Sequence, residues 1–434
     1  MKYLYRKSYL LLFIFFFCFS LVITRWYRVP LENANYEPRG GVYGDVWSSL
    51  NVYSAARHFK DYGFRKTAGL PVFGYNGNFD EHWTYAYTHY PPLPDELAGM
   101  YAIITDSKDV KVLSLFPIGL SVFFFFFIYY ALQVLSDNKP TAFFAATVTV
   151  MSCYFICWAD DLHQHVYAEF SKWIFVLLLY LYYNREQHKK IILFVLCLLY
   201  LINSWLTYED IVYFAIAVVG FSIIYKKKIF TIENFILLFI PVLGFGLHAY
   251  QNYCYFGSWD TVIKDLKGAF IMRTTGTPNA EQGVMHWKQW TEFPSKIEFR
   301  FKRMFLVTYY SFIFLAVLGF LNLYKTNKKL FWVNITLLLC SISWIFTMPQ
   351  HAYIHLFTIR QFGLFYASIL CAGFYAYWLI LKQHWDQRKI IPISFHAIFI
   401  VYTIINTISS HVYYVYLKFG YGFPLLGIDS NTSY

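Results

Sequence analysis

Charged residues are scarce in this sequence: Asp, Glu, Lys and Arg make up only 14% of its 434 residues, whereas 58% are hydrophobic. So few polar side chains cannot cover the surface of an ordinary soluble globular protein. The mean hydropathy of +0.41 agrees with this shortage of polar surface. The composition therefore excludes most soluble classes and predicts a membrane protein.

Cysteine is scarce too, and its distribution excludes a disulfide-stapled secreted domain. Most of the seven cysteines lie inside apolar runs, and only Cys254 falls in a long polar segment. The sequence also lacks a glycine-rich nucleotide-binding loop, a periodic repeat and a low-complexity linker. We therefore expect a single integral membrane domain over residues 1–434.

Apolar runs long enough to cross a bilayer as helices recur along the chain. They predict an all-α polytopic membrane protein with about 11 transmembrane helices and amphipathic helices in its outer loops. The first run could instead be a signal peptide, but it lacks a small-residue cleavage pattern, so we expect a retained anchor. The expected spans lie near residues 9–24, 112–135, 141–158, 169–183, 191–206, 211–225, 233–250, 304–323, 330–348, 361–381 and 390–408.

Lysines and arginines gather at the start of the chain and in every second connection, which indicates the cytoplasmic side. These residues are Lys2, Arg6, Lys7, Lys139, Arg185, Lys189, Lys190, Lys226, Lys227, Lys228, Lys325, Lys328, Lys329, Lys382, Arg388 and Lys389. We therefore expect a cytoplasmic N-terminus and an outer C-terminus. Much of the net charge of +11 serves this topology, so nucleic acid is not an expected partner.

Two connections on the outer side are long enough to be structured, residues 25–111 and residues 251–303. In the first, Ser48–Phe64 carries apolar residues at helical spacing and predicts an amphipathic helix. A second helix is expected near Asp95 and Glu96, whose acids suit a first helical turn. The second loop is rich in lysine and arginine, which suits anionic headgroups of membrane lipids.

Histidines and acidic residues collect on this outer side, which suggests a membrane enzyme. They are Asp45, His89, Asp160, Asp161, His163, His165, Glu209, Asp210, His351 and His355. Asp45 precedes the expected amphipathic helix and is the candidate catalytic base, because a carboxylate beside the bilayer can accept a hydroxyl proton. Its alternative role is that of a helix cap.

The turn from Trp158 to His165 is the candidate metal or phosphate site. Asp160, Asp161 and His165 are the candidate ligands of a divalent metal, although no cofactor is certain from the sequence. Asp161 and His165 would share one helix face because they are four residues apart. A solvated membrane turn that merely needs polar residues is the alternative.

Further candidate substrate contacts occur in three other outer segments. Arg360 could bind two phosphate oxygens through its guanidinium fork. On a helix, His351 and His355 would align with each other. The full set of candidate substrate-binding residues is His89, Tyr90, Asp160, Asp161, His163, His165, Glu209, His351, His355 and Arg360. For His89, an ordinary interface histidine is an equal alternative.

The chain resembles the polytopic C-type (GT-C) glycosyltransferases, which include dolichyl-phosphate-mannose protein mannosyltransferases and lipid A aminoarabinose transferases. The resemblance rests on Gly44-Asp45 after the first span, on Tyr90-Pro91-Pro92-Leu93-Pro94, and on the Asp160-Asp161 turn. Many relatives carry an acidic pair at the first motif, whereas Val46 follows Asp45 here. This departure weakens any claim of a metal at Asp45.

The resemblance implies an enzyme that moves a sugar from a polyprenyl-phosphate donor to an acceptor hydroxyl, with inversion. Asp45 would then be the catalytic base, and Asp160 and Asp161 would organise the donor phosphate or a metal. The acceptor would be a lipid, a glycan or a protein on the outer face of the plasma membrane.

A secondary transporter or lipid flippase is the main alternative. Such a protein would place ionisable groups near the bilayer midplane, often on broken helices. Pro241 with Gly244 and Gly246 is the one hint of a broken span. A noncatalytic partner in envelope assembly is the third reading, and it would be favoured if Asp45 and the acidic turn lay far apart.

Overall fold

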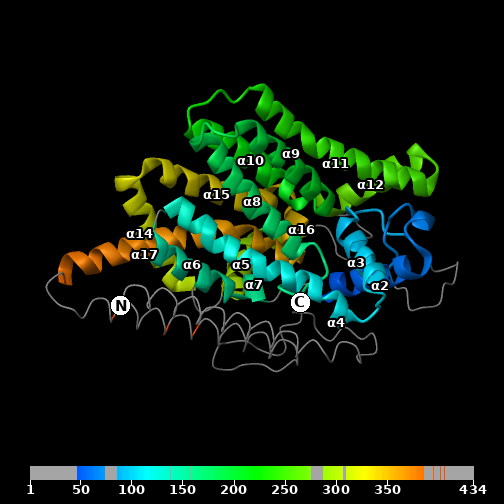
Figure 1. The fold of residues 1–434 in the computed structure, drawn as a ribbon, viewed down its shortest axis with the longest axis horizontal. Coiled ribbons are helices and arrows are strands. Elements are labelled where there is room, and N and C mark those ends of the chain that lie inside the picture. The colour runs from blue at the N-terminus through cyan, green and yellow to red at the C-terminus, as the bar shows by residue number, and fades with distance from the viewer. Residues whose placement is uncertain are drawn as a thin grey trace.

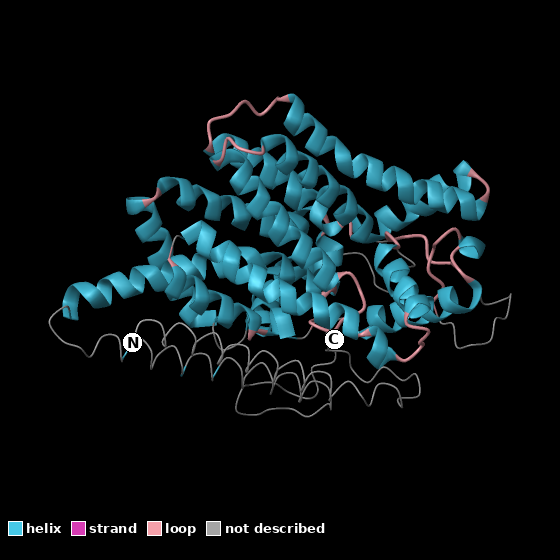
Figure 2. Ribbon diagram, viewed as in Figure 1, coloured by secondary structure: helices cyan, strands magenta, loops and turns pink. Residues whose placement is uncertain are grey.

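The computed structural model describes residues 46–73, 86–136, 138–156, 158–274, 287–305 and 309–385, together with residues 394, 401 and 405. Asp45 and the first predicted span lie outside these residues, as does nearly all of the last predicted span. Within the described ranges every regular element is a helix, and one isolated antiparallel bridge joins Val72 to Ala86 (Figure 2). The all-α prediction is confirmed.

Each predicted span from 112–135 to 361–381 coincides with a helix or with a pair of helices. These are α5 (Leu115–Ser136), α6 (Lys139–Val150) with α7 (Cys153–Ile156), α8 (His165–Asn184), α9 (Lys189–Leu206), α10 (Glu209–Ile224), α11 (Ile232–Phe256), α14 (Tyr309–Thr326), α15 (Lys328–Thr347) and α17 (Gly363–Trp385). Five helical segments are long and apolar enough to cross a membrane: Val110–Ser136, Lys189–Leu206, Ile232–Phe256, Lys328–Thr347 and Phe357–Gln383. The full number of spans stays a prediction.

Large apolar side chains stand exposed on several of these helices. Phe123 is 69% exposed on α5, Phe194 is 68% exposed on α9, and Phe235 is 64% exposed on α11. Exposed phenylalanines on so many long apolar helices would be unfavourable in water and suit contact with lipid.

The predicted span 141–158 is not one continuous helix, because α6 ends at Val150 and the short α7 follows. Hydroxyl side chains compete for backbone carbonyls just where the helix ends. The Thr149 hydroxyl donates to the Ala145 carbonyl at 2.8 Å, and the Ser152 hydroxyl donates to the Thr149 carbonyl at 2.6 Å. Such local hydrogen bonds give the backbone an alternative to the helical pattern.

Helix α11 continues through Pro241 and ends at Gly257, whose φ of +70° suits a residue without a Cβ. The hint of a broken span is therefore wrong. Gly244 is required for packing instead, because a Cβ there would overlap the Ser204 hydroxyl of α9 and lie 2.9 Å from Ser204 Cβ. Small residues at such contacts let two membrane helices approach closely.

The segment 25–111, predicted to lie on the outer side and called the first outer loop below, contains the predicted amphipathic helix as α2 (Val46–Tyr62) and a second helix as α3 (Leu93–Ile104). Val52, Ala56 and Phe59 of α2 are fully buried, and a Cβ on Gly99 of α3 would lie 2.6 Å from Phe59 Cδ2. The two helices pack closely and lie with the short α4 (Val110–Leu113) at one end of the molecule (Figure 1).

The second loop predicted to lie on the outer side contains α12 (Trp259–Thr274) and α13 (Trp287–Phe305). The α15–α17 connection contains α16 (Pro349–Ile354) and the 3₁₀ helix η4 (Leu356–Phe362). Arg300 of α13 is buried and donates to the carbonyls of Tyr353 at 2.7 Å and His355 at 3.0 Å. This arginine, expected among the basic residues that suit lipid headgroups, instead fixes the end of α16.

Candidate functional site

The turn before α8 is buried and is tied to the first outer loop. Asp160 is 1% exposed and Asp161 is fully buried. The Asp161 carboxylate accepts hydrogen bonds from the His163 backbone N–H at 3.2 Å and from the Ser49 hydroxyl of α2. Asp161 and His165 do not share one helix face as predicted, because α8 begins only at His165, but His165 Nε2 still lies 3.9 Å from Asp161 Oδ2.

The candidate base Asp45 lies outside the described residues, so its own place in the site is untested. Its covalent neighbour Val46 begins α2, and Ser49 stands in the first turn of that helix. Because Ser49 contacts Asp161, the start of α2 lies against the acidic turn.

The turn before α10 joins the same region. Glu209 is 6% exposed and accepts hydrogen bonds from the Tyr90 hydroxyl at 2.9 Å and from Gln164 Nε2 at 3.5 Å. One carboxylate therefore links the first outer loop, the acidic turn and α10. The sequence-predicted residues Tyr90 and Glu209 are brought together.

The α16–η4 segment adds the third group of predicted residues. The ring of Phe357 lies between them, at 4.8 Å from the His165 ring, 5.5 Å from His351 and 4.9 Å from His355. His351 and His355 do not align along one helix as predicted, because α16 ends at Ile354 and His355 is extended. Their rings still lie 4.6 Å apart.

Arg360 is the most unusual side chain of this cluster, because it is 4% exposed and yet forms no ion pair with a carboxylate of the described residues. The guanidinium lies over aromatic rings, 4.9 Å from the centre of Trp158 and 5.5 Å from the centre of Tyr154. Nε and Nη1 of Arg360 lack a hydrogen-bond partner among the described residues, as do Trp158 Nε1 and His165 Nε2. Such open donors around a cation favour an anionic ligand.

The predicted metal ligands do not form a coordination set as placed. Asp161 Oδ1 already accepts two hydrogen bonds, and His165 Nε2 is 3.9 Å from Asp161 Oδ2. Across the described residues, no group of three or more His, Cys, Asp or Glu side chains is positioned to hold a metal ion. A metal at Asp160, Asp161 and His165 stays a prediction, and the chemistry below uses none.

His89 turns away from this cluster. His89 Nε2 lies 2.8 Å from Asp265 Oδ1 of α12, and the Thr88 hydroxyl donates to Asp265 Oδ2 at 2.6 Å. The pairing anchors the first outer loop to α12, which matches the alternative reading of His89 as a hydrogen-bonded interface histidine.

A buried ionic network next to Arg360 was missed by the sequence reasoning. Lys172 of α8 is 1% exposed, and its Nζ lies 2.8 Å from Glu169 and 3.1 Å from Asp210. The sequence does contain an indication of this network. Glu169 and Lys172 are charged residues inside a predicted membrane span, and such residues are functional candidates by default.

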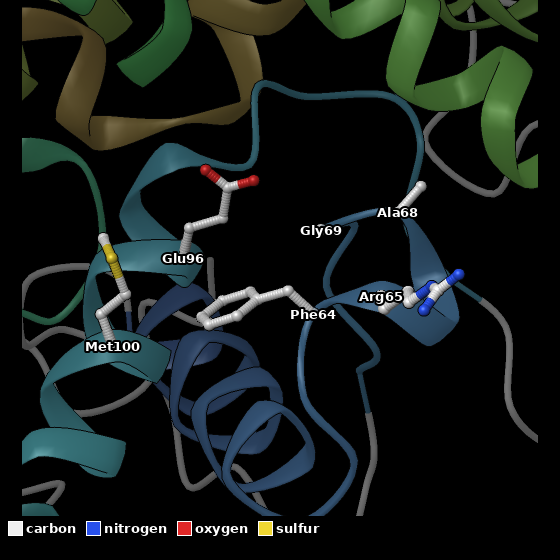
Figure 3. A pocket seen from close by; sticks show the side chains of 6 residues that line it. All are labelled: Phe64, Arg65, Ala68, Gly69, Glu96 and Met100. Carbon is white, nitrogen blue, oxygen red and sulfur yellow. The ribbon is translucent and has the colours of Figure 1, made fainter.

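A cavity of about 530 Å³ lies apart from this cluster, in the first outer loop. Its lining includes Phe64, Met100 and Glu96, and none of the predicted site residues (Figure 3). Burial raises the pKa of Glu96 to about 7, although a hydrogen bond from Gln251 acts in the opposite direction. We do not assign the reaction to this cavity, because its donors and charges are fewer than those around Arg360.

No protein-family model and no curated protein sequence matches this chain. Among solved structures, the chain is similar to the oligosaccharyltransferase of Archaeoglobus fulgidus, crystallised with a disulfide-tethered acceptor peptide that contains the NVT sequon. The identity is 12% and the TM-score is 0.44, over 93% of this chain and 55% of that one. The chain thus spans about half the length of that enzyme, and a likeness at this level assigns neither a family nor an activity.

Proposed function

We propose that this chain is a membrane glycosyltransferase of the GT-C type. It transfers a sugar from a polyprenyl-phosphate donor to a hydroxyl of a lipid, glycan or protein acceptor at the outer face of the plasma membrane. The observation that carries the proposal is the buried Arg360 with its open Nε and Nη1, set among histidines and acids from three outer turns.

Arg360 binds the donor phosphate in this account. Burying a charge without a partner costs desolvation free energy. An anionic ligand would offset this cost by pairing with the guanidinium. A phosphodiester offers two oxygens to the guanidinium fork, and the indole N–H of Trp158 supplies another donor. These donors are already oriented, so they stabilise the negative charge that grows on the departing phosphate.

The acceptor hydroxyl attacks the anomeric carbon from the face opposite the phosphate. A bond forms between the acceptor oxygen and that carbon, and the bond from the carbon to the phosphate oxygen breaks. The electron pair stays on the polyprenyl phosphate, and the hydroxyl proton passes to the Asp45 carboxylate. The configuration at the anomeric carbon is inverted. A positioned general base is typically worth about 10² to 10⁴ in rate.

The buried Glu169, Lys172 and Asp210 side chains favour a second candidate, a transporter or lipid flippase. Ionisable groups inside a helical bundle are typical of transport pathways. A transporter would move a labelled substrate across a sealed vesicle without changing it. A transferase would form a new glycosidic product.

The test is transfer of radiolabelled sugar from a panel of polyprenyl-phosphate sugars in membranes that contain equal amounts of each protein. We expect transfer by the parent chain and its loss in Asp45→Asn and Arg360→Gln. Arg185→Gln is the matched control, because Arg185 is an exposed arginine at the far end of α8. Equal transfer by the parent and Arg360→Gln would exclude the proposed phosphate site. Vectorial movement of unchanged donor would favour the transporter.

A further inference from the structure

We propose that Lys172 is a positioning residue that orients Arg360 through two carboxylates, Asp210 and Glu169. The proposal rests on the phosphate role of Arg360 given above and adds the machinery that holds this arginine in place. Lys172 reaches Arg360 by two separate chains of contacts, one through the backbone neighbour of Arg360 and one through the ring beneath its guanidinium.

The first chain of contacts runs through Asp210 to η4. Lys172 Nζ lies 3.1 Å from Asp210 Oδ1, and the Gln361 amide donates to the same oxygen at 2.8 Å. The Asn203 amide of α9 holds the other oxygen of Asp210 at 3.1 Å. Gln361 directly follows Arg360, so this contact fixes the backbone of η4 where the arginine leaves it.

The second chain runs through Glu169 to the aromatic bed of the guanidinium. Lys172 Nζ lies 2.8 Å from Glu169 Oε1, and the Tyr154 hydroxyl donates to Glu169 Oε2 at 2.6 Å. The Trp173 indole donates to the Tyr154 hydroxyl at 3.2 Å. The Tyr154 ring is thus held at its edge, with its centre 5.5 Å from the Arg360 guanidinium.

The charges of this network favour the burial of Arg360, whose fork meets no carboxylate among the described residues. Lys172 carries +1 and the two carboxylates carry −2, so the triad has a net charge of −1. That surplus has the sign that favours burial of the Arg360 guanidinium, which lies on the other side of the Tyr154 ring from Glu169 in this chain of contacts. The triad attracts the guanidinium without forming a hydrogen bond to Nε or Nη1. Both nitrogens can therefore donate to the donor phosphate.

Lys172 is the shared member of both chains and has no substitute nearby among the described residues. Its ammonium is fully buried between the two carboxylates and lies 5.1 Å from the centre of the Tyr213 ring. Removing it would leave two carboxylates in a low-dielectric interior with no cation between them. Relaxation of Asp210 and Glu169 would then loosen both Gln361 and Tyr154.

The test is a double-mutant cycle on the binding of polyprenyl phosphate to detergent-purified protein, with the variants Gln361→Met and Tyr154→Phe. Each variant breaks one chain of contacts and leaves Lys172 in place, so neither unbalances the buried charge. We expect each to weaken binding about 10-fold in the parent background, because residues that belong to one hydrogen-bond network are energetically coupled. In the Arg360→Gln background we expect less than about a 2-fold effect, because there is no guanidinium left to position.

The background dependence separates positioning from a merely structural role. Equal weakening in both backgrounds, accompanied by a lower melting temperature, would overturn the inference and leave the network as a fold stabiliser. If Arg360→Gln weakens binding but Gln361→Met and Tyr154→Phe do not, the inference fails while the proposed function survives. If Arg360→Gln itself leaves binding unchanged, the proposed function fails. Lys172→Met should likewise weaken binding in the parent and not in the Arg360→Gln background, and Lys189→Met is its control, since Lys189 pairs with the exposed Glu186.

Discussion

At the scale of single residues, the proposed function depends on charged side chains that are buried in the protein, Arg360 and Lys172 among them. The sequence singles out Arg360, His351 and His355 because histidines and an arginine at one membrane edge exceed what an interface needs, and their role at a site stays a prediction. Glu169 and Lys172 were not predicted as site residues. They lie at the start of the predicted span 169–183, whose apolar composition indicates only a membrane helix. Asp265 as the partner of His89 could not be foreseen, since they come from separate loops.

The buried ion triad gives a residue-scale prediction about stability. Lys172→Met should destabilise the protein by about 3–5 kcal/mol, because it leaves buried carboxylates without their cation. Thermal unfolding in detergent, followed by intrinsic fluorescence, measures the change. The double variant Lys172→Met with Asp210→Asn should recover part of the loss, and Lys189→Met should change little, because that lysine is 31% exposed on the surface. Equal effects of Lys172→Met and Lys189→Met would contradict the prediction.

At the scale of elements, the helices were mostly predictable and their breaks were not. Apolar length predicts α5, α9, α11 and α15, because a spanning helix needs only about 20 apolar residues. The end of α6 at Val150 was missed, because it depends on hydroxyl side chains that compete for carbonyls inside an apolar run. The glycines of α11 were misread, because their spacing does not reveal that Gly244 faces Ser204.

The contact between α9 and α11 provides a test with a matched control on one helix. Gly244→Ala should lower the melting temperature, because the added Cβ overlaps the Ser204 hydroxyl. Gly246→Ala should be neutral or stabilising, because nothing lies within 4 Å of its Cβ position and alanine favours helix by about 1 kcal/mol over glycine. Differential scanning fluorimetry measures the melting temperature of both variants. A larger decrease in Gly246→Ala than in Gly244→Ala would contradict the described packing of α11 against α9.

The contact of α3 with Gln251 of α11 should depend on pH through Glu96. Burial raises the pKa of this carboxyl from 4.5 to about 7, so the folded state holds its proton more tightly than the unfolded state does. Between those two pH values the folded state binds more protons, so stability falls as pH rises and levels off above about 7. Hydrogen exchange of Leu93–Ile104, corrected for intrinsic rates, should show less protection at pH 8 than at pH 5.

The control for this pH dependence is Glu96→Gln, which keeps a hydrogen-bonding side chain beside Gln251 and cannot ionise. Its protection should not change between the two pH values. A parent protein with the same protection at both values would contradict the role given to Glu96.

At the scale of the whole molecule, the main prediction from the sequence was that the histidines and acidic residues of the outer connections lie together on one side. Within the described residues, the turns at Trp158–His165, Thr207–Asp210 and His351–Gln361 do meet, through Gln164 with Glu209 and through His165 with Phe357. Periodicity could not reveal these meetings, because they depend on how separate helices pack. Asp45 and the topology of both termini stay predictions, since their residues lie outside the described ranges.

The most direct test of the central claim is the rate of sugar transfer from polyprenyl-phosphate donors by Arg360→Lys, compared with the parent at saturating donor. Lysine keeps the positive charge but lacks the planar fork that binds two phosphate oxygens. We predict a rate at least about 10-fold lower, since hydrogen bonds to charged groups contribute about 1.5–3 kcal/mol. A parent-like rate in Arg360→Lys would show that no fork holds the donor phosphate and would contradict this account.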